Sequence, residues 1–320
     1  MTTAYYDIFN GDADGICALH QLRLAEPREA TLVTGVKRDV RLLDQVAQVR
    51  GAELTVLDIS LDSNRAPLLQ LLESCRVFYV DHHYAGDLPD SPNLIAHLDP
   101  SPEICTSLIV DSLLGGRFRG WGVAAAFGDN LHDAARKAAA SLDLTEGQVA
   151  QLRELGELMN YNGYGREVAD LHLPPQALYA AVQPYVDPLV FCKEARILAQ
   201  LRQGFADDLR RARAVPPLRE TGHGRIFAFP AEKWASRIAG VFSNEKARER
   251  EDAAHALLVD NGDTTFMVSV RAPIARRVGA DVLCRAFPTG GGRAAAAGIN
   301  ALPGVQVEDF CRKFFEVFSP

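Results

Sequence analysis

Three features that the sequence lacks restrict what this protein can be. No apolar run reaches the roughly 20 residues that a helix needs to cross a bilayer, so we expect no membrane partner. Basic residues are outnumbered, with 34 Lys and Arg against 41 Asp and Glu and a net charge of -7, which argues against a long nucleic acid as partner. The 6 cysteines are scattered, without a CxxC pair. Together with the lack of a basic-then-apolar leader at the N-terminus, they indicate a reducing, cytoplasmic location and no disulfides.

The 320 residues are 48% hydrophobic and 23% charged, as in ordinary globular proteins, and are enough for one large core and a second, smaller one. The first hundred residues alternate between strand and helix patterns. The strand-like segments are YYDIF, ATLVTGV, ELTVLDI, RVFYVDHH and NLIAHLD. The helix-like segments between them are ICALHQLRLAE, VRLLDQVAQV and APLLQLLES. This alternation predicts an α/β fold, a parallel sheet with helices on both faces.

A helical pattern runs from Glu103 to about Tyr185, and Pro188–Val215 resembles one long helix that ends at two prolines. Strand patterns then resume in RIFAFP, HALLVDNG and TTFMVSVRA, with helices expected around Trp234–Lys246 and Val307–Phe318. The predicted organisation is a catalytic domain at 1–187, a linker helix at 188–215 and a smaller α/β substrate-binding domain at 216–320.

Acidic side chains follow several of the expected strands. They are Asp12 and Asp14 in NGDADG, Asp58 at the end of ELTVLD, Asp81 with His82 and His83 at the end of RVFYVDHH, and Asp129 in AAFGDNL. The carboxyl ends of parallel strands meet in one crevice, and all these points except Asp129 satisfy that rule. Each motif alone is typical of a solvated turn, a cap or a structural histidine. Their combination indicates a common site.

Several carboxylates in one crevice repel each other, and each is costly to desolvate without a partner. Divalent cations supply that partner. Oxygen ligands with an imidazole suit manganese or magnesium, and the histidine also allows zinc or iron. Two neighbouring ions, with Asp58 between them, would form a site for displacement at phosphorus.

These motifs resemble those of the DHH phosphoesterases, and TGGGRAAAAG resembles the glycine-rich motif of the DHH-associated domain that follows in one subfamily. The resemblance implies two divalent cations, most often manganese. It also implies hydrolysis of short oligonucleotides, linear or cyclic dinucleotides, or nucleotide phosphate esters. The implied metal ligands are Asp12, Asp14, Asp58, His82 and Asp129. The implied catalytic residues are Asp81, which would orient the histidines, and His83, which would face the scissile phosphate or its leaving oxygen.

The chain departs from the family pattern at two positions. Many members carry a metal-binding His four residues before the first Asp of the Asp-x-Asp pair, where Ile8 stands here, and the nearby Asn10 is a poor substitute. The glycine motif usually ends in His, where this chain has Arg293. An arginine retains a phosphate contact but stays charged, so it cannot donate a proton.

Phosphate binding is expected in the second domain. Gly290, Gly291 and Gly292 leave the backbone N–H groups accessible to a phosphate, and Arg293 and Arg271 could hold one. The alanine run after the glycines could begin a helix and add its dipole.

The leading function is therefore hydrolysis of linear dinucleotides or very short oligonucleotides to mononucleotides. A cyclic-dinucleotide phosphodiesterase and a nucleotide bisphosphate phosphatase stay open as alternatives. A processive single-strand nuclease and a pyrophosphatase fit less well. From another class, a non-catalytic nucleotide sensor also fits, chiefly because of Ile8. The sequence leaves monomer and homodimer open.

Overall fold

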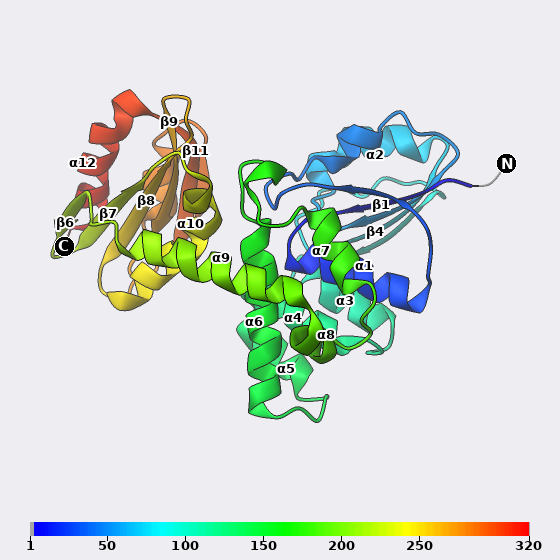
Figure 1. Ribbon diagram of the computed structural model, residues 1–320. Helices are drawn as coiled ribbons and strands as arrows, with labels where there is room; N and C mark the ends of the chain where they lie inside the picture. Colours follow the sequence, from blue (N-terminus) through cyan, green and yellow to red (C-terminus); the bar gives the residue numbers. More distant parts are fainter. Residues whose placement is uncertain (1–2, 320) are drawn as a thin grey trace. The chain divides into compact units, whose positions relative to one another are not determined.

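The computed structural model describes residues 3–319, and these fall into two compact units that meet between Gln203 and Gly204 in the sequence. The boundary falls inside helix α9 (Arg196–Arg213). Each unit is built around one β-sheet with helices packed on it (Figure 1). Across residues 3–319, helices with the length and apolarity required to span a membrane are absent.

The first unit contains a five-stranded sheet in the order β2-β1-β3-β4-β5, and all its neighbouring strands are parallel. The strands are β1 (Tyr5–Phe9), β2 (Thr31–Thr34), β3 (Glu53–Leu57), β4 (Arg76–Asp81) and β5 (Leu94–Leu98). The predicted parallel sheet is confirmed, and each expected strand is present. Because the strands are parallel, the residues that follow them all leave the sheet at the same edge.

Helices cover both faces of this sheet. Helix α2 (Arg65–Leu72) lies on one face, and α1 (Ala13–Ala25) and α3 (Thr106–Leu113) lie on the other (Figure 1). The segment VRLLDQVAQV was expected to be a helix, but only Leu42–Val46 forms a 3-10 turn. The side chain of Asn64 explains the difference, because it accepts from the N–H of Leu43 and donates to the carbonyl of Val40. These bonds take the place of regular helical ones.

The rest of the first unit is helical. It contains α4 (Arg119–Gly128), α5 (His132–Ala139), α6 (Glu146–Gly163), α7 (Pro175–Val182) and α8 (Pro188–Glu194). The prediction of one long helix from Pro188 was wrong. The backbone of Ala195, with φ -75° and ψ 108°, is extended and separates α8 from α9. Phe191 is fully buried against the rings of Trp121 and Tyr185. This packing holds α8 in its own direction, so the helix breaks at Ala195 although no Gly or Pro stands there.

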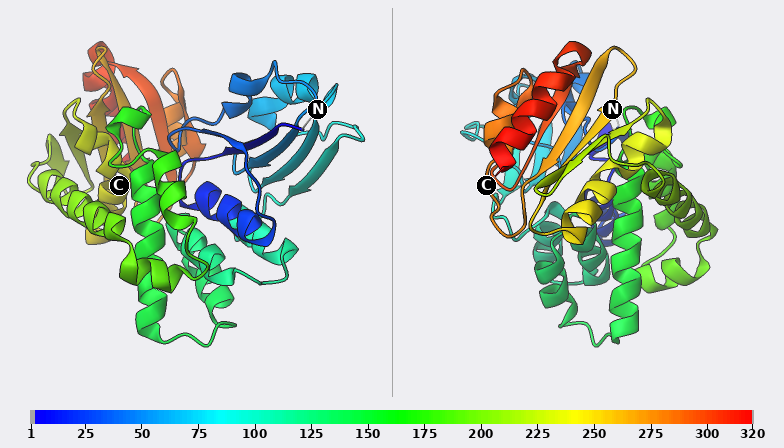
Figure 2. Two further views of the ribbon diagram at one scale, coloured as in Figure 1. Left: turned by 45° about the vertical axis from the view of Figure 1, so that its right-hand side comes forward. Right: turned by 90° about the vertical axis from the view of Figure 1, so that its left-hand side faces the viewer.

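The second unit contains a six-stranded sheet in the order β10-β11-β9-β8-β7-β6, in which only β7 and β8 are parallel neighbours among the described strands. The strands are β6 (Arg219–Thr221), β7 (Gly224–Phe229), β8 (Ala254–Asp260), β9 (Thr265–Arg271), β10 (Gly290–Arg293) and β11 (Ala296–Pro303). The helices are α10 (Lys233–Glu249), α11 (Ala280–Arg285) and α12 (Val307–Phe318). Figure 2 shows α12, in red, lying along one face of this sheet. The smaller second α/β domain is thus confirmed.

The alanine run was expected to begin a helix, and this was wrong. Gly290–Arg293 and Ala296–Pro303 form the two strands of a hairpin, in which Arg293 pairs with Ala296. Along the second strand, Ala297, Ile299 and Leu302 are buried in the core. That burial outweighs the helix propensity of alanine.

Candidate metal centre

The NGDADG motif forms the tight connection between β1 and α1. Oδ1 of Asp12 caps α1 by accepting from the N–H groups of Asp14 at 3.0 Å and Gly15 at 3.2 Å. Both flanking glycines are required by close approaches: a Cβ at Gly11 would lie 2.0 Å from the carbonyl oxygen of Gly35, and one at Gly15 would lie 2.2 Å from that of Asn10. The motif therefore fixes the backbone positions of Asp12 and Asp14.

Asp14 lies in the first turn of α1 and is 1% exposed. Its two carboxylate oxygens accept from the backbone N–H groups of Thr106 and Ser107, each at 2.7 Å. These donors belong to the first turn of α3, where the helix dipole favours a negative charge. Asp14 is thus held by hydrogen bonds between the starts of two helices.

Asp58 follows β3 directly, at the same edge of the sheet. Its φ of 59° is in the left-handed region, which few residues other than glycine adopt and which is often found at functional sites. Oδ1 accepts from the hydroxyl of Thr106 at 3.1 Å. Burial, followed by the charges of Asp14 and Asp12, raises the pKa of Asp58 well above its ordinary value. A cation beside this carboxylate would offset both effects.

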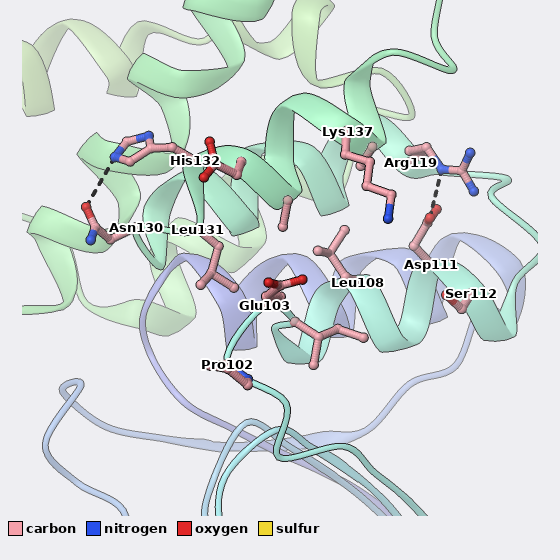
Figure 3. Close-up of a pocket in the computed structure, with 14 residues that line it drawn as sticks. Pro102, Glu103, Leu108, Asp111, Ser112, Arg119, Asn130, Leu131, His132 and Lys137 are labelled. Carbon is pink, nitrogen blue, oxygen red and sulfur yellow. Dashed lines mark hydrogen bonds and ion pairs between the residues drawn. The ribbon is translucent and has the colours of Figure 1, made fainter.

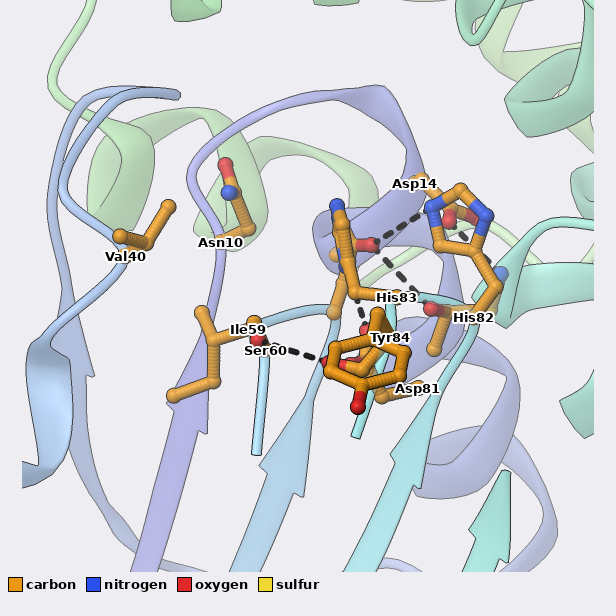
Figure 4. Close-up of polar contacts among 12 residues, drawn as sticks. Asn10, Asp14, Val40, Ile59, Ser60, Asp81, His82, His83 and Tyr84 are labelled. Atoms are coloured by element: carbon orange, nitrogen blue, oxygen red, sulfur yellow. Dashed lines mark hydrogen bonds and ion pairs between the residues drawn. The ribbon is translucent and has the colours of Figure 1, made fainter. Parts of the chain in front are cut away.

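The Asp-His-His segment presents His82 to these carboxylates (Figure 4). Its Nδ1 lies 3.0 Å from the carbonyl oxygen of Ile104. A carbonyl can only accept, so Nδ1 carries a proton and Nε2 is the nitrogen that faces the carboxylates, the orientation of a metal-ligating histidine. Nε2 lies 3.5 Å from Oδ1 of Asp58 and 3.7 Å from Oδ2 of Asp129.

His83 is oriented by a different partner. Its Nδ1 donates to Oδ1 of Asp81 at 2.7 Å, and Asp81 is fully buried at the end of β4. Burial lowers the pKa of His83, but the hydrogen bond to Asp81 and its charge outweigh burial, so the pKa is raised overall. Nε2 of His83 is left for a cation, a water or a substrate.

Asp129 completes the cluster from the end of α4, beside Asn130, whose φ of 63° ends the helix. Two overlapping groups place their ligand atoms within 4.8 Å of one another: Asp58, His82 and His83, and Asp14, His82 and Asp129. The structure therefore places four of the five predicted metal ligands in these two groups, and His83 lies beside them. Carboxylate oxygens with an imidazole fit a divalent cation.

Lys37 is a residue of this site that the sequence analysis missed. Its Nζ donates to Oδ2 of Asp12 at 2.5 Å, to Oδ1 of Asn160 at 2.9 Å and to Oδ1 of Asp129 at 3.3 Å. Burial raises the pKa of Asp12, but Lys37 outweighs it and the net shift is downward. The signal was present in the sequence, because Lys37 follows ATLVTGV and so leaves the sheet at the same edge as the aspartates.

A pocket of about 680 Å³ lies beside the metal centre, among α3, α4 and α5 (Figure 3). It is lined by Leu108, Asp111, Arg119, Leu131, His132 and Lys137, among others. Nε of Arg119 donates to Oδ2 of Asp111 at 2.8 Å, so these two charges satisfy each other. The predicted ligands are not among the residues that line it, which makes it separate from the centre.

In the second unit, the predicted substrate residues gather on three adjacent strands. Arg293 on β10 is opposite Ala296 on β11, which is opposite Arg271 on β9. Directly opposed residues project from the same face, so the two arginines share a face and start about 10 Å apart. Nε of Arg271 donates to Oδ1 of Asn244 at 2.9 Å, while Arg293 is exposed.

The triple glycine forms the edge strand beside this face. Gly291 pairs with Gly298, and Gly292 has a φ of 132°, which disfavours any side chain. An edge strand presents backbone N–H groups on its outer side. Arg271, Gly290–Gly292 and Arg293 are therefore neighbours in one sheet, although the expected helix beside them is absent.

The fold is that of the DHH-domain proteins. A DHH-domain protein described as a member of the S1p family of ribosomal proteins superposes with a TM-score of 0.66 at 12% identity, over 98% of this chain and 86% of that one. Exonuclease RecJ bound to manganese superposes with a TM-score of 0.64 at 13% identity, over 97% and 89%. The pGpG-specific phosphodiesterase PggH from Vibrio cholerae gives 0.53 at 12% identity, over 98% of each chain. No family model and no curated protein matches the sequence.

Proposed function

We propose that this protein is a metal-dependent phosphoesterase that hydrolyses linear dinucleotides or very short oligonucleotides to mononucleotides. The observation that carries the proposal is the convergence of Asp14, Asp58, Asp129 and Nε2 of His82 beside one edge of a parallel sheet. Two proteins of the same fold, an exonuclease bound to manganese and a pGpG phosphodiesterase, support the reaction class.

Each residue of the centre has a distinct part in this reaction. Asp14, Asp58, His82 and Asp129 would hold a divalent cation, which stabilises charge on the phosphoryl oxygens and activates water. Asp81 holds the ring of His83 and keeps its Nδ1 protonated. When the ring is protonated, Nε2 could donate a proton to the leaving oxygen, and the hydrogen bond to Asp81 would orient it for that step.

The second unit would bind the phosphate that does not react. Arg271 and Arg293 offer two charged donors on one face, with the small side chain of Ala296 between them. Arginine forms charge-assisted bonds with phosphate oxygens, which can be bidentate. A net charge of -7 favours a short substrate over a long polyanion.

A substrate panel with manganese tests the proposal. It contains linear dinucleotides, cyclic dinucleotides, oligomers of up to about ten nucleotides and a nucleotide bisphosphate, each assayed with and without chelator. We expect rapid, chelator-sensitive turnover of the linear dinucleotide. Preference for the cyclic dinucleotide or the bisphosphate would select one of the alternatives. Tight nucleotide binding without turnover of any substrate would select the sensor.

The expectation of two manganese ions stays a prediction. Manganese was bound by an exonuclease of this fold, and the ligand set accepts it. The second ion depends on Asp12, but Oδ1 of Asp12 caps α1 and Oδ2 accepts from Lys37. The cytoplasmic location and a homodimer likewise stay predictions.

A further inference from the structure

The backbone around Lys37 is held in place at the edge of the metal centre. Its N–H donates to the carbonyl of Gly163 at 2.9 Å, and its own carbonyl accepts from Nδ2 of Asn10 at 3.1 Å. The preceding Gly35 passes so close to Asp39 that a Cβ there would lie 2.4 Å from Oδ2. These contacts fix the backbone from which the lysine side chain extends to the carboxylates.

The ammonium group of Lys37 is fully matched by oxygens from three helices. An ammonium has three N–H donors. The three oxygens within reach of Nζ belong to Asp12 at the start of α1, Asp129 at the end of α4 and Asn160 on α6. Two of them are carboxylates. This is the environment that a bound cation requires, and a side chain of the protein occupies it.

Both oxygens of Asp12 already accept hydrogen bonds. Its Oδ1 accepts from two backbone N–H groups and its Oδ2 from Lys37. Both groups whose ligand atoms lie within 4.8 Å of one another, among residues 3–319, leave Asp12 out. Ile8, at the position from which a histidine could have added a ligand, is fully buried in the apolar cluster over the sheet.

We propose that Lys37 supplies the positive charge that a second divalent ion would supply, so that the centre holds one divalent cation beside a fixed ammonium. That ion would be held by His82 together with carboxylates of the two groups that share it, Asp14 and Asp129 in one and Asp58 in the other. The inference rests on the proposed metal centre, but not on any substrate. It also implies that activation by manganese follows a one-site curve.

Counting bound ions tests the proposal without an activity assay. Metal-free protein is titrated calorimetrically with Mn²⁺, and electron paramagnetic resonance of the loaded protein reports whether ions are coupled in pairs. Wild type should bind one ion in the centre, with an uncoupled spectrum. Lys37→Met keeps the length of the side chain and removes the charge, so it should bind a second, coupled ion. Lys137→Met, at an exposed position on α5, is the matched control and should bind one.

Two outcomes would overturn the inference: two ions in wild type, or one ion in both wild type and Lys37→Met. If Lys37→Met does not fold, Asp12→Asn gives a second test, since asparagine also caps helices well. Asp14→Asn should lower Mn²⁺ affinity about 10-fold or more, because it removes a ligand. Asp12→Asn should cost clearly less. Equal losses would make Asp12 a ligand and contradict the proposal.

The same titration separates this inference from the proposed function. A protein that binds one ion but hydrolyses none of the substrates would defeat the phosphoesterase proposal and leave the role of Lys37 intact. A protein that turns over dinucleotides with two coupled ions would do the reverse.

Discussion

The two units hold charged groups in contrasting ways. In the first unit, the acids lie at strand ends and helix starts, where backbone N–H groups hold them: Asp12 and Asp14 accept four such bonds between them. In the second unit, Arg271 and Arg293 lie on the strands of a sheet, and the one partner described for Nε of Arg271 is the side chain of Asn244. Asp12 and Asp14 are therefore buried and held by backbone donors, whereas Arg271 is held by a side chain and Arg293 is exposed.

The largest effect is expected from Asp58→Asn, which changes a carboxylate of the buried cluster with little change in shape. Loss of several kcal/mol of metal-dependent stabilisation should lower kcat/KM for the dinucleotide by about 1,000-fold or more. Without metal, the same change should raise the thermal midpoint, because it removes a buried charge whose pKa is raised by burial and by its neighbours. Steady-state kinetics and calorimetry measure the two effects. Near-normal turnover would mean that the cluster is not the reaction centre.

Arg293→Ala probes the exposed partner in the comparison. Loss of a hydrogen bond to a charged phosphate, about 1.5–3 kcal/mol, should lower kcat/KM for the dinucleotide by about one to two orders of magnitude. Manganese affinity should not change. For bis-nitrophenyl phosphate, which lacks a second phosphate, the same variant should lose much less of its kcat/KM. Equal losses for both substrates would place Arg293 at the reacting phosphate or in folding.

Gly292→Ala tests whether the glycine strand needs its bare backbone. Gly292 has a φ of 132°, and a Cβ there would lie 2.5 Å from the Cα of Ala297. The substitution should therefore lower the free energy of unfolding by about 1–3 kcal/mol. Gly291→Ala is the matched control, since a Cβ there meets no atom of residues 3–319 within 4 Å. Denaturant unfolding compares the two. Equal stability of the two variants would show that the strand tolerates a side chain at Gly292 as well as at Gly291.

The smallest effect is expected in the pH dependence of stability, to which the carboxyls of Asp58 and Asp129 contribute. Burial and like charges raise the pKa values of Asp58 and Asp129, so both carboxyls bind protons more tightly in the folded than in the unfolded chain. Metal-free protein should therefore lose stability as pH rises from the ordinary value of 3.8 through the raised values. Saturating manganese should abolish or reverse this slope. Thermal melts with chelator and with manganese measure it, and identical slopes would contradict cation binding by these groups.

The contrast also explains what could be predicted from sequence. Strand alternation gave the parallel sheet, and the position of Asp12, Asp14, Asp58 and Asp81 after strands gave the cluster, because chain direction alone brings such residues together. Lys37 obeys the same rule, but a single lysine in a loop has no motif. It is recognised only by the three oxygens around its Nζ.

The errors have a common physical cause. A local sequence pattern does not show the distant side chains whose contacts decide whether a segment forms a helix, a strand or a break. Asn64 prevents the helix expected before β3, and packing of Phe191 fixes the break at Ala195. Core burial of Ile299 turns an alanine-rich run into a strand. Each partner lies far along the chain or in the core, where helix or strand propensity gives no information.

The two hydrogen bonds of Asp14 also set an order of events during synthesis. Its donors, Thr106 and Ser107, follow it by 92 and 93 positions in the sequence. A nascent chain that has not yet emerged beyond them contains NGDADG and the first strands, yet has no complete cation site. The proposed site also needs Asp129 at the end of α4, so metal capture would wait until α3 and α4 have docked, and the ion would stabilise the assembled unit rather than guide its early folding.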